Sequence, residues 1–314
     1  MLLLLEDAQH FVRGPEWTWY ILFYFFFGGL SGGSYALATL LRLTGRDNEP
    51  AARVGYYVSF ATLLPCPVLL TLDLGEPLRF WHMLVNTTPG DEGLVFRYWS
   101  PMSVGAWALV VFGAFSTVSF VEALARDRGL HLPGVGLLDG VFGQLFAIVG
   151  TVFGLFIAGY TGVLLAVSNQ PVWSDTWTLG ALFLASGLSA SAALMGWLVH
   201  QRSDARDAAA GLVRSERFFQ VLELLALVLF VVTLIPAGNG ILVRAFGFPW
   251  YLLWAVALFG IASGLRAPGA ARSHDMPSGG SVAVRTRRTV ATWSMVLVLL
   301  GVLAMRAAVI FSAQ

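Results

Sequence analysis

The chain has 314 residues, of which 57% are apolar and only 12% are charged, and its mean hydropathy is +0.74. An ordinary water-soluble domain carries roughly 25% charged residues, so a soluble packed domain is excluded. The net charge is +1 and all 19 basic residues are Arg, with no basic patch outside short connections, which argues against nucleic-acid binding. The single cysteine, Cys66, excludes a cysteine cluster for an Fe–S centre or zinc.

Eight apolar runs are long enough to cross a bilayer. The hydrocarbon core is about 30 Å thick and takes about 20 apolar residues per helix, and backbone inside lipid must bond to itself. The runs cover residues 19–41, 54–72, 101–121, 141–166, 177–199, 218–235, 249–265 and 289–310. We predict an all-α polytopic membrane protein, with residues 1–314 forming one integral membrane domain. Its roughly eight transmembrane helices form a bundle of two four-helix halves, although the sequence shows no internal repeat.

The arginines predict the orientation. Fourteen of the 19 lie in the connections that follow the first, third, fifth and seventh runs. The positive-inside rule places these connections in the cytoplasm, so both termini and the even connections are expected outside the cytoplasmic (inner) membrane. The N-terminal MLLLLEDAQHF lacks a basic segment, which argues against a cleaved signal peptide. Residues 267–288, rich in Gly, Pro, Ser and Arg, are predicted to form a flexible cytoplasmic loop.

Charged residues gather in the long outer connection of residues 73–100. Asp73, Glu76, Arg79 and His82 lie within ten residues of one another. If the helix continues beyond Asp73, the i, i+3 spacing brings several of them near one face. Two interpretations remain open: an ion-pair cluster at the membrane surface, or groups that exchange protons with a ligand held just below them.

Three polar residues inside the runs are candidates for a proton path. Glu223 lies about one turn inside the sixth run, toward the cytoplasm, and an intramembrane carboxylate is costly enough to suggest a relay or a partner for a buried Arg. A helix-end residue that snorkels to water is the alternative. Gln144 in the fourth run is a candidate neighbour of Glu223. Arg306 in the eighth run is either an interfacial anchor or a counter-charge for Asp73.

Tyr160 and the glycines of the first run suggest a ligand site. Tyr160 is expected near the outer end of the fourth run, where its phenol either hydrogen-bonds a carbonyl of a ring or belongs to the interfacial aromatic belt. The segment GGLSGG, residues 28–33, favours close helix packing, and the alternative is bare backbone that admits a flat ligand. All five histidines fall in loops or at helix ends, so we expect no haem and no metal in this chain.

These motifs together resemble a known family. GGLSGG, DLGEPLRFWHML followed by SPMS, and GYTGVLLA followed by PVW are similar to the NrfD-like family, the membrane subunits of polysulfide-reductase-type and related molybdopterin complexes. The resemblance implies an eight-helix anchor that binds menaquinone or ubiquinone near the face where a ferredoxin-like Fe–S subunit docks. That subunit exchanges electrons with a molybdopterin catalytic subunit on the extracytoplasmic face. The family's ring-contacting tyrosine corresponds to Tyr160, whereas the first helix lacks the expected His or Asn.

The sequence therefore predicts a membrane anchor that exchanges electrons and protons between the quinone pool and an Fe–S partner. The predicted quinone-binding residues are Tyr160, Asp73, His82, Arg79, Tyr20 and Ser100, and the predicted proton path comprises Glu223, Gln144 and Arg306. The other expected contacts are membrane lipid, with no nucleic acid. A secondary transporter would need mid-membrane charges and commonly paired repeats. A purely structural anchor without a quinone site is the second alternative.

Overall fold

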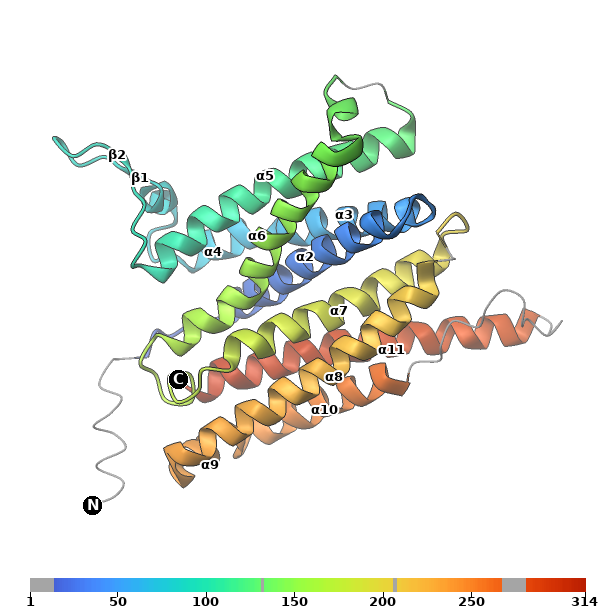
Figure 1. Cartoon of the computed structure of the whole chain (residues 1–314). Helices are drawn as coiled ribbons and strands as arrows, with labels where there is room; N and C mark the ends of the chain where they lie inside the picture. The colour runs from blue at the N-terminus through green and yellow to red at the C-terminus, as the bar shows by residue number, and fades with distance from the viewer. Residues whose placement is uncertain (1–13, 131–132, 206–207, 267–280) are drawn as a thin grey trace, which may run out of the picture.

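The computed structural model describes residues 14–130, 133–205, 208–266 and 281–314, and it is almost entirely helical (Figure 1). Its α-helices are α2 (Trp19–Thr44), α3 (Glu49–Leu63), α4 (Pro65–Asp73), α5 (Pro101–Arg128), α6 (Gly140–Ala166), α7 (Leu179–Gln201), α8 (Ala209–Leu234), α9 (Asn239–Phe246), α10 (Trp250–Arg266) and α11 (Ser281–Ser312). Within the described ranges, seven helical segments are long and apolar enough to cross a membrane, and the bent pair α9–α10 makes an eighth. The predicted all-α membrane fold is confirmed.

Prolines stand at interruptions in two of the spans. The second span is built from α3 and α4, and Pro65 stands at the first position of α4, where its missing N–H is tolerated. In the seventh span, α9 and α10 meet at an angle of 69° around Pro249. The helix of the sixth span, α8, begins at Ala209 rather than at residue 218. Its first turns are polar, so the hydropathy of the sequence did not indicate that they are helical. Of the predicted flexible loop, residues 267–280 lie outside the described part of the chain, and α11 begins at Ser281.

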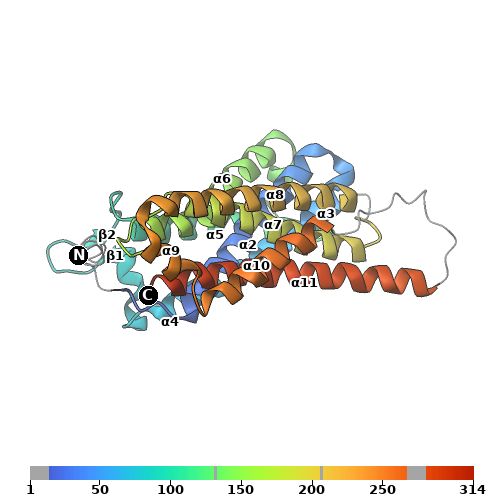
Figure 2. The same cartoon turned by 90° about the horizontal axis from the view of Figure 1, so that it is seen from below.

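The helices form two four-span groups. The first group contains α2, α3 with α4, α5 and α6, and the second contains α7, α8, α9 with α10, and α11 (Figure 1). Helices α2 and α6 pack on α7, and α11 also touches α2. Figure 2 shows α11 running beside α10. The two groups therefore meet along α2, which is the most buried of the spans.

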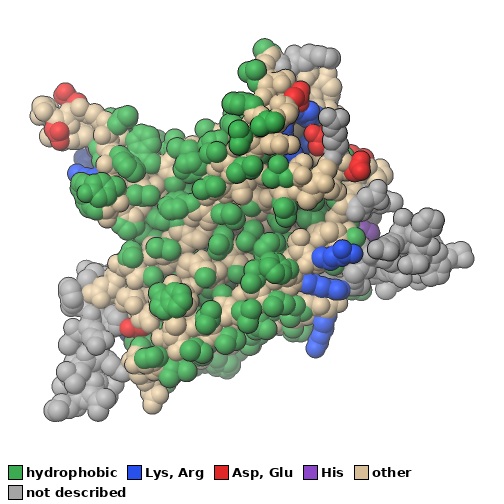
Figure 3. Space-filling view, viewed as in Figure 1, with side chains coloured by type: hydrophobic (Ala, Val, Ile, Leu, Met, Phe, Trp, Pro, Cys, Tyr) green, Lys and Arg blue, Asp and Glu red, His purple; other side chains and the backbone are tan. Residues whose placement is uncertain are grey.

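The two ends of the bundle differ. One end carries the connections α2–α3, α5–α6 and α7–α8, and we call it the arginine-rich end. The other carries the two-stranded β1 (Val85–Asn86) and β2 (Gly93–Leu94), and we call it the hairpin end. Figure 3 shows basic side chains gathered mainly at the arginine-rich end and an apolar band between the two ends. Such a band matches the hydrocarbon layer of a bilayer.

Glycines of α2 allow the two groups to approach closely. A Cβ added at Gly32 would lie 2.0 Å from the carbonyl oxygen of Gly154 on α6. A Cβ at Gly33 would lie 2.9 Å from the carbonyl oxygen of Gly187 on α7. The helix-packing interpretation of GGLSGG is therefore confirmed.

Substituting Gly32 tests this interface. We expect Gly32→Ala to lower thermal stability in detergent, because the added methyl overlaps the backbone of α6, and overpacking costs about 1–3 kcal/mol or more. The control is Gly113→Ala on α5, where nothing lies within 4 Å of the new Cβ. Equal melting temperatures for both variants, measured by light scattering on heating, would contradict the packing described.

Candidate functional site

Tyr160 stands at the hairpin end of α6 and is largely buried. Its hydroxyl donates a hydrogen bond to the backbone carbonyl of Pro101, at 2.5 Å, and its ring stacks on Phe156 with 5.3 Å between centroids. Gly105 on α5 makes room for the phenol, since a Cβ there would lie 2.4 Å from its oxygen. Tyr160 is thus not a freely exposed belt residue. Its oxygen still has a lone pair with which to accept a hydrogen bond.

Asp73 contacts the start of the first span. Thr18 Oγ1 donates to Asp73 Oδ1 at 3.1 Å, which links the end of α4 to the beginning of α2. Thr18 is also the N-cap of α2 and accepts from the backbone N–H of Tyr20 at 3.3 Å. The Tyr20 side chain itself is exposed. The first span therefore supplies a hydroxyl beside the carboxylate, where the resemblance led us to expect a His or Asn.

The remaining residues of the outer loop do not share a helical face with Asp73. Helix α4 ends at Asp73, and the chain reaches a 3-10 helix, η2 (Pro77–Met83), through a non-helical Leu74–Gly75–Glu76 segment. Pro77 explains the break, because the residue before a proline avoids helical angles. Arg79 and His82 are exposed on η2, with His82 against the ring of Trp81 at 3.9 Å between centroids. The conditional i, i+3 arrangement is not formed.

Ser100 serves a local structural purpose. Its hydroxyl accepts from the backbone N–H of Ser103 at 3.5 Å and caps α5. The next residue, Pro101, receives the hydrogen bond of Tyr160. Ser100 is therefore one residue from the phenol's partner, which keeps it near the candidate ring site.

Sequence reasoning missed Tyr24. This tyrosine is buried on α2 and lies within electrostatic range of Cys66 on α4 and Tyr160 on α6. Its ring packs against that of Phe25, with 5.5 Å between centroids. Its signal was hidden in the aromatic run WYILFYFFF, in which nothing distinguishes an inward-facing ring from a lipid-facing one.

Arg306 is fully buried between the two helix groups. Its guanidinium donates to the backbone carbonyls of Phe25 on α2 and Phe183 on α7, the latter at 2.9 Å, and lies 4.7 Å from the centre of the Phe183 ring. Ser186 Oγ accepts a further bond at 3.2 Å. Gly29 makes room for this group, because a Cβ there would lie 2.6 Å from a guanidinium nitrogen. Both predictions for Arg306, an interfacial anchor or a counter-charge for Asp73, are wrong.

Glu223 is buried near the middle of α8. At about 1.5 Å per residue it lies about 21 Å along a helix about 39 Å long, because α8 begins earlier than predicted. It accepts a hydrogen bond from Ser189 Oγ on α7 at 2.5 Å, and its charge acts on Arg306. Glu223 is thus neither one turn inside its helix nor a residue that snorkels to water. Gln144 is exposed on α6, so the predicted contact between Gln144 and Glu223 is not made.

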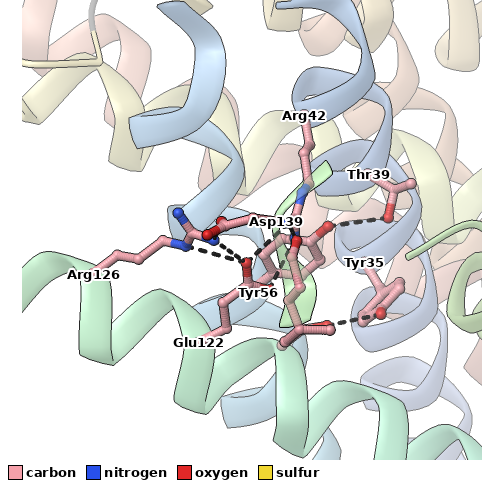
Figure 4. A network of polar contacts seen from close by, with 9 residues as sticks. Tyr35, Thr39, Arg42, Tyr56, Glu122, Arg126 and Asp139 are labelled. Carbon is pink, nitrogen blue, oxygen red and sulfur yellow. Dashed lines mark hydrogen bonds and ion pairs between the residues drawn. The ribbon is translucent and has the colours of Figure 1, made fainter. Parts of the chain in front are cut away.

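A network of ion pairs and hydrogen bonds lies at the arginine-rich end (Figure 4). Glu122 on α5 accepts from Arg42 on α2, at 2.9 Å from each of two nitrogens, and from Arg126 at 2.9 Å. Arg126 also bonds to Asp139 at 2.5 Å and holds the pKa of that carboxyl below its ordinary value. Nearby hydroxyls pair with each other, among them Tyr35 with Ser119 at 2.8 Å. This network ties α2, α5 and the start of α6 together.

No group of three or more potential metal ligands occurs among the residues that the structure describes. His10, His131 and His274 lie outside those residues, and His200 is exposed at the end of α7. The side chains at the hairpin end include phenols, a carboxylate, an imidazole and hydroxyls, which can bind and transfer protons.

The fold and these buried polar groups define a multi-pass helical membrane protein. The family model described as polysulphide reductase, NrfD, matches residues 8–314, and the chain belongs to this family. Protein NrfD of Escherichia coli is 27% identical over 296 residues, which cover 87% of this chain and 90% of that protein.

Two further relatives carry the names of reductase subunits. The C chain of the polysulfide reductase of Wolinella succinogenes is 27% identical over 184 residues, covering 55% of both proteins. The C subunit of the tetrathionate reductase of Salmonella typhimurium is 26% identical over 194 residues, covering 62% of the present protein and 52% of that relative.

Breaking the network at the arginine-rich end should destabilise the fold. We expect Glu122→Gln to cost about 3–5 kcal/mol, because Arg42 and Arg126 would lose their shared buried carboxylate. Asp139→Asn is the matched control, since it removes another carboxylate partner of Arg126 but from an exposed position. Urea or detergent unfolding followed by tryptophan fluorescence measures both. A larger loss for Asp139→Asn than for Glu122→Gln would refute this assignment.

Proposed function

We propose that this chain is the quinone-interacting membrane subunit of a molybdopterin reductase complex. It exchanges electrons and protons between the membrane quinone pool and an Fe–S partner subunit. The observation that carries the proposal is membership of the NrfD family, together with relatives named as subunits of polysulfide and tetrathionate reductases. Oxidation of one quinol yields one quinone, two electrons and two protons, and reduction of a quinone is the reverse. The electrons pass one at a time through the nearest cluster of the partner.

The proposed ring site lies at the hairpin end of the first helix group. Tyr160 and Tyr24 supply phenols, and Asp73 with Thr18 supplies a carboxylate and a hydroxyl. While Tyr160 donates to Pro101, its oxygen can accept a hydrogen bond from a quinol hydroxyl. To donate to a quinone carbonyl it must leave Pro101, so the two redox forms would make different bonds. Asp73 is placed to take up or return a proton.

The hairpin end also offers a surface for the partner. Leu78, Leu94 and Tyr98 have exposed fractions of 89%, 76% and 75%. Asp91 and Glu92 are exposed in the same loop, and such charges belong in water rather than in lipid. Apolar side chains exposed to water mark sites of protein contact. We propose that Arg79 and His82, exposed on η2, orient the Fe–S subunit on this surface.

The orientation follows from charge. The arginine-rich end is proposed to face the cytoplasm, which places the hairpin end, both termini and the partner on the outer side of the cytoplasmic membrane. An electron entering from the partner then reaches a quinone close to the outer surface.

Binding of a quinol analogue tests the ring site. A fluorescent hydroxyquinoline N-oxide is titrated into the purified chain, and Tyr160→Phe with Asp73→Asn is compared with the exposed-site control Tyr98→Phe. Each lost hydrogen bond is worth about 0.5–1.5 kcal/mol, so we expect the double variant to weaken binding by at least about fivefold. The control should bind as the unmodified chain does.

Unaltered affinity in the double variant would refute this site. Absence of binding by the unmodified, folded chain would instead favour the structural-anchor alternative. Melting temperatures of all samples show whether a loss of affinity reflects unfolding, because Tyr160 also joins α6 to α5.

A further inference from the structure

A groove opens at the arginine-rich end between the two helix groups. Its walls are the last turns of α2 and the first turns of α8, which lie at the same end of the bundle (Figure 1) and both pack on α7. The groove has a volume of about 290 Å³, close to the lower limit of about 300–1,000 Å³ for small-molecule pockets. It is therefore large enough for part of a flexible ligand.

The lining of the groove is mixed. Leu37 on α2 and Leu212 on α8 supply apolar wall, while Thr44, Asn48 and Ser215 bring hydroxyls and an amide. A water-soluble ligand would leave the leucine side chains unmatched, and a pure hydrocarbon would leave the polar groups unmatched. The lining therefore suits an amphiphile, a molecule with a hydrocarbon part and oxygen acceptors.

The groove lies at the depth of the lipid headgroups. The apolar part of α8, from Phe218 to Leu234, spans about 24 Å at about 1.5 Å per residue, which covers most of a hydrocarbon core of about 30 Å. Ser215 precedes Phe218 by about 4.5 Å on the arginine-rich side. Gly211, Ser215, Phe218 and Leu222 follow at i, i+4, i+7 and i+11, so they share one face of α8. The groove thus opens onto exposed apolar side chains, over which a hydrocarbon chain can continue into the bilayer.

Arg214 supplies a positive charge beside the groove. It is exposed on α8 and pairs with no carboxylate among the residues that the structure describes. Arg202, in contrast, is held by Asp127 and Asp204. Arg214 and Gly211 are three residues apart and so are neighbours on the helix surface. Gly211 has no side chain that would separate the guanidinium from the groove.

Ser215 supplies an unused hydroxyl on the groove wall. Within the described ranges this hydroxyl makes no hydrogen bond. The Thr44 hydroxyl on the α2 side is occupied, since it donates to carbonyls of its own helix and accepts from Asn48. Asp47, next to Asn48, is exposed and would repel an anion. A phosphate is therefore favoured on the α8 side, where its oxygens can accept from Ser215 and Arg214.

We propose that this groove binds an anionic phospholipid. One acyl chain lies along Leu37 and Leu212 and continues over Phe218, and the phosphate is held by Arg214 and Ser215. A zwitterionic phospholipid fills the apolar wall equally well, but its own cation offsets the attraction to Arg214. The bound lipid joins the ends of α2 and α8, and hence the two helix groups. This site is separate from the proposed quinone site at the hairpin end and does not rest on it.

Photocrosslinking tests the site. The full-length protein is placed in nanodiscs of phosphatidylcholine that contain a small fraction of a probe lipid with a diazirine in its acyl chain. The probe is either phosphatidylglycerol or phosphatidylcholine, and mass spectrometry quantifies the adducts after irradiation. We expect the phosphatidylglycerol probe to label residues 37–44 and 211–222 about fivefold more than the phosphatidylcholine probe, the preference that one basic residue gives near a membrane surface.

Two variants separate charge from shape. Arg214→Gln should lower labelling by the phosphatidylglycerol probe to the level of the other probe. Arg128→Gln is the matched control, because it makes the same change at an exposed position at the end of α5 and should leave the preference unaltered. Gly211→Phe should lower labelling by both probes several-fold, since its ring fills the groove. The fold accommodates this change, because a Cβ at Gly211 meets no atom within 4 Å.

Equal labelling of these segments by the two probes, or a full preference in Arg214→Gln, would overturn the proposal. Loss of the phosphatidylglycerol adducts on addition of excess quinone would also overturn it, because the groove would then take quinone. Melting temperatures show whether each variant is folded. Binding of the quinol analogue, measured in the same nanodiscs, should be equal in Arg214→Gln and the unmodified chain. No analogue binding with an intact lipid preference would refute the quinone site alone.

Discussion

The fold depends on one buried cation. Arg306 has no exposed surface, and a guanidinium removed from both water and the lipid surface must find acceptors inside the protein. The acceptors are backbone carbonyls of α2 and α7 and the hydroxyl of Ser186. The charge of Glu223 also interacts with the guanidinium. These contacts join α11 to both helix groups. Gly29 is required where it stands, because a side chain there would displace the guanidinium.

This constraint also brings buried polar residues of the two helix groups toward one another. The phenols Tyr24 and Tyr160 belong to the first helix group, and Glu223 on α8 belongs to the second. Arg306 bonds to the carbonyl of Phe25, the residue beside Tyr24, and its charge interacts with that of Glu223. A secondary transporter also needs charges at mid-membrane. Family membership favours a redox subunit over a transporter for the same charges.

The sequence predicted what depends on long-range averages and missed what depends on the direction of single side chains. Hydropathy placed all eight spans, because each needs a long apolar run. It could not show that Arg306 faces inward, nor that polar first turns extend α8 and move Glu223 to mid-helix. Asp73 and His82 do not share a helical face, because the helix ends before Pro77. Pro77 is visible in the sequence and could have predicted this break. Predicting that the side chains of Tyr24 and Gln220 are buried requires knowledge of which helices touch.

Photolabelling with an azidoquinone can locate the proposed quinone site at the hairpin end. The complex in native membranes is irradiated with the probe and the labelled peptides are sequenced by mass spectrometry, with and without excess quinone. A quinone site at the hairpin end should give adducts on the start of α2, around Thr18 and Tyr24, and on the segment of α6 that holds Tyr160, and excess quinone should suppress them. Suppressible adducts confined to the arginine-rich end would contradict it.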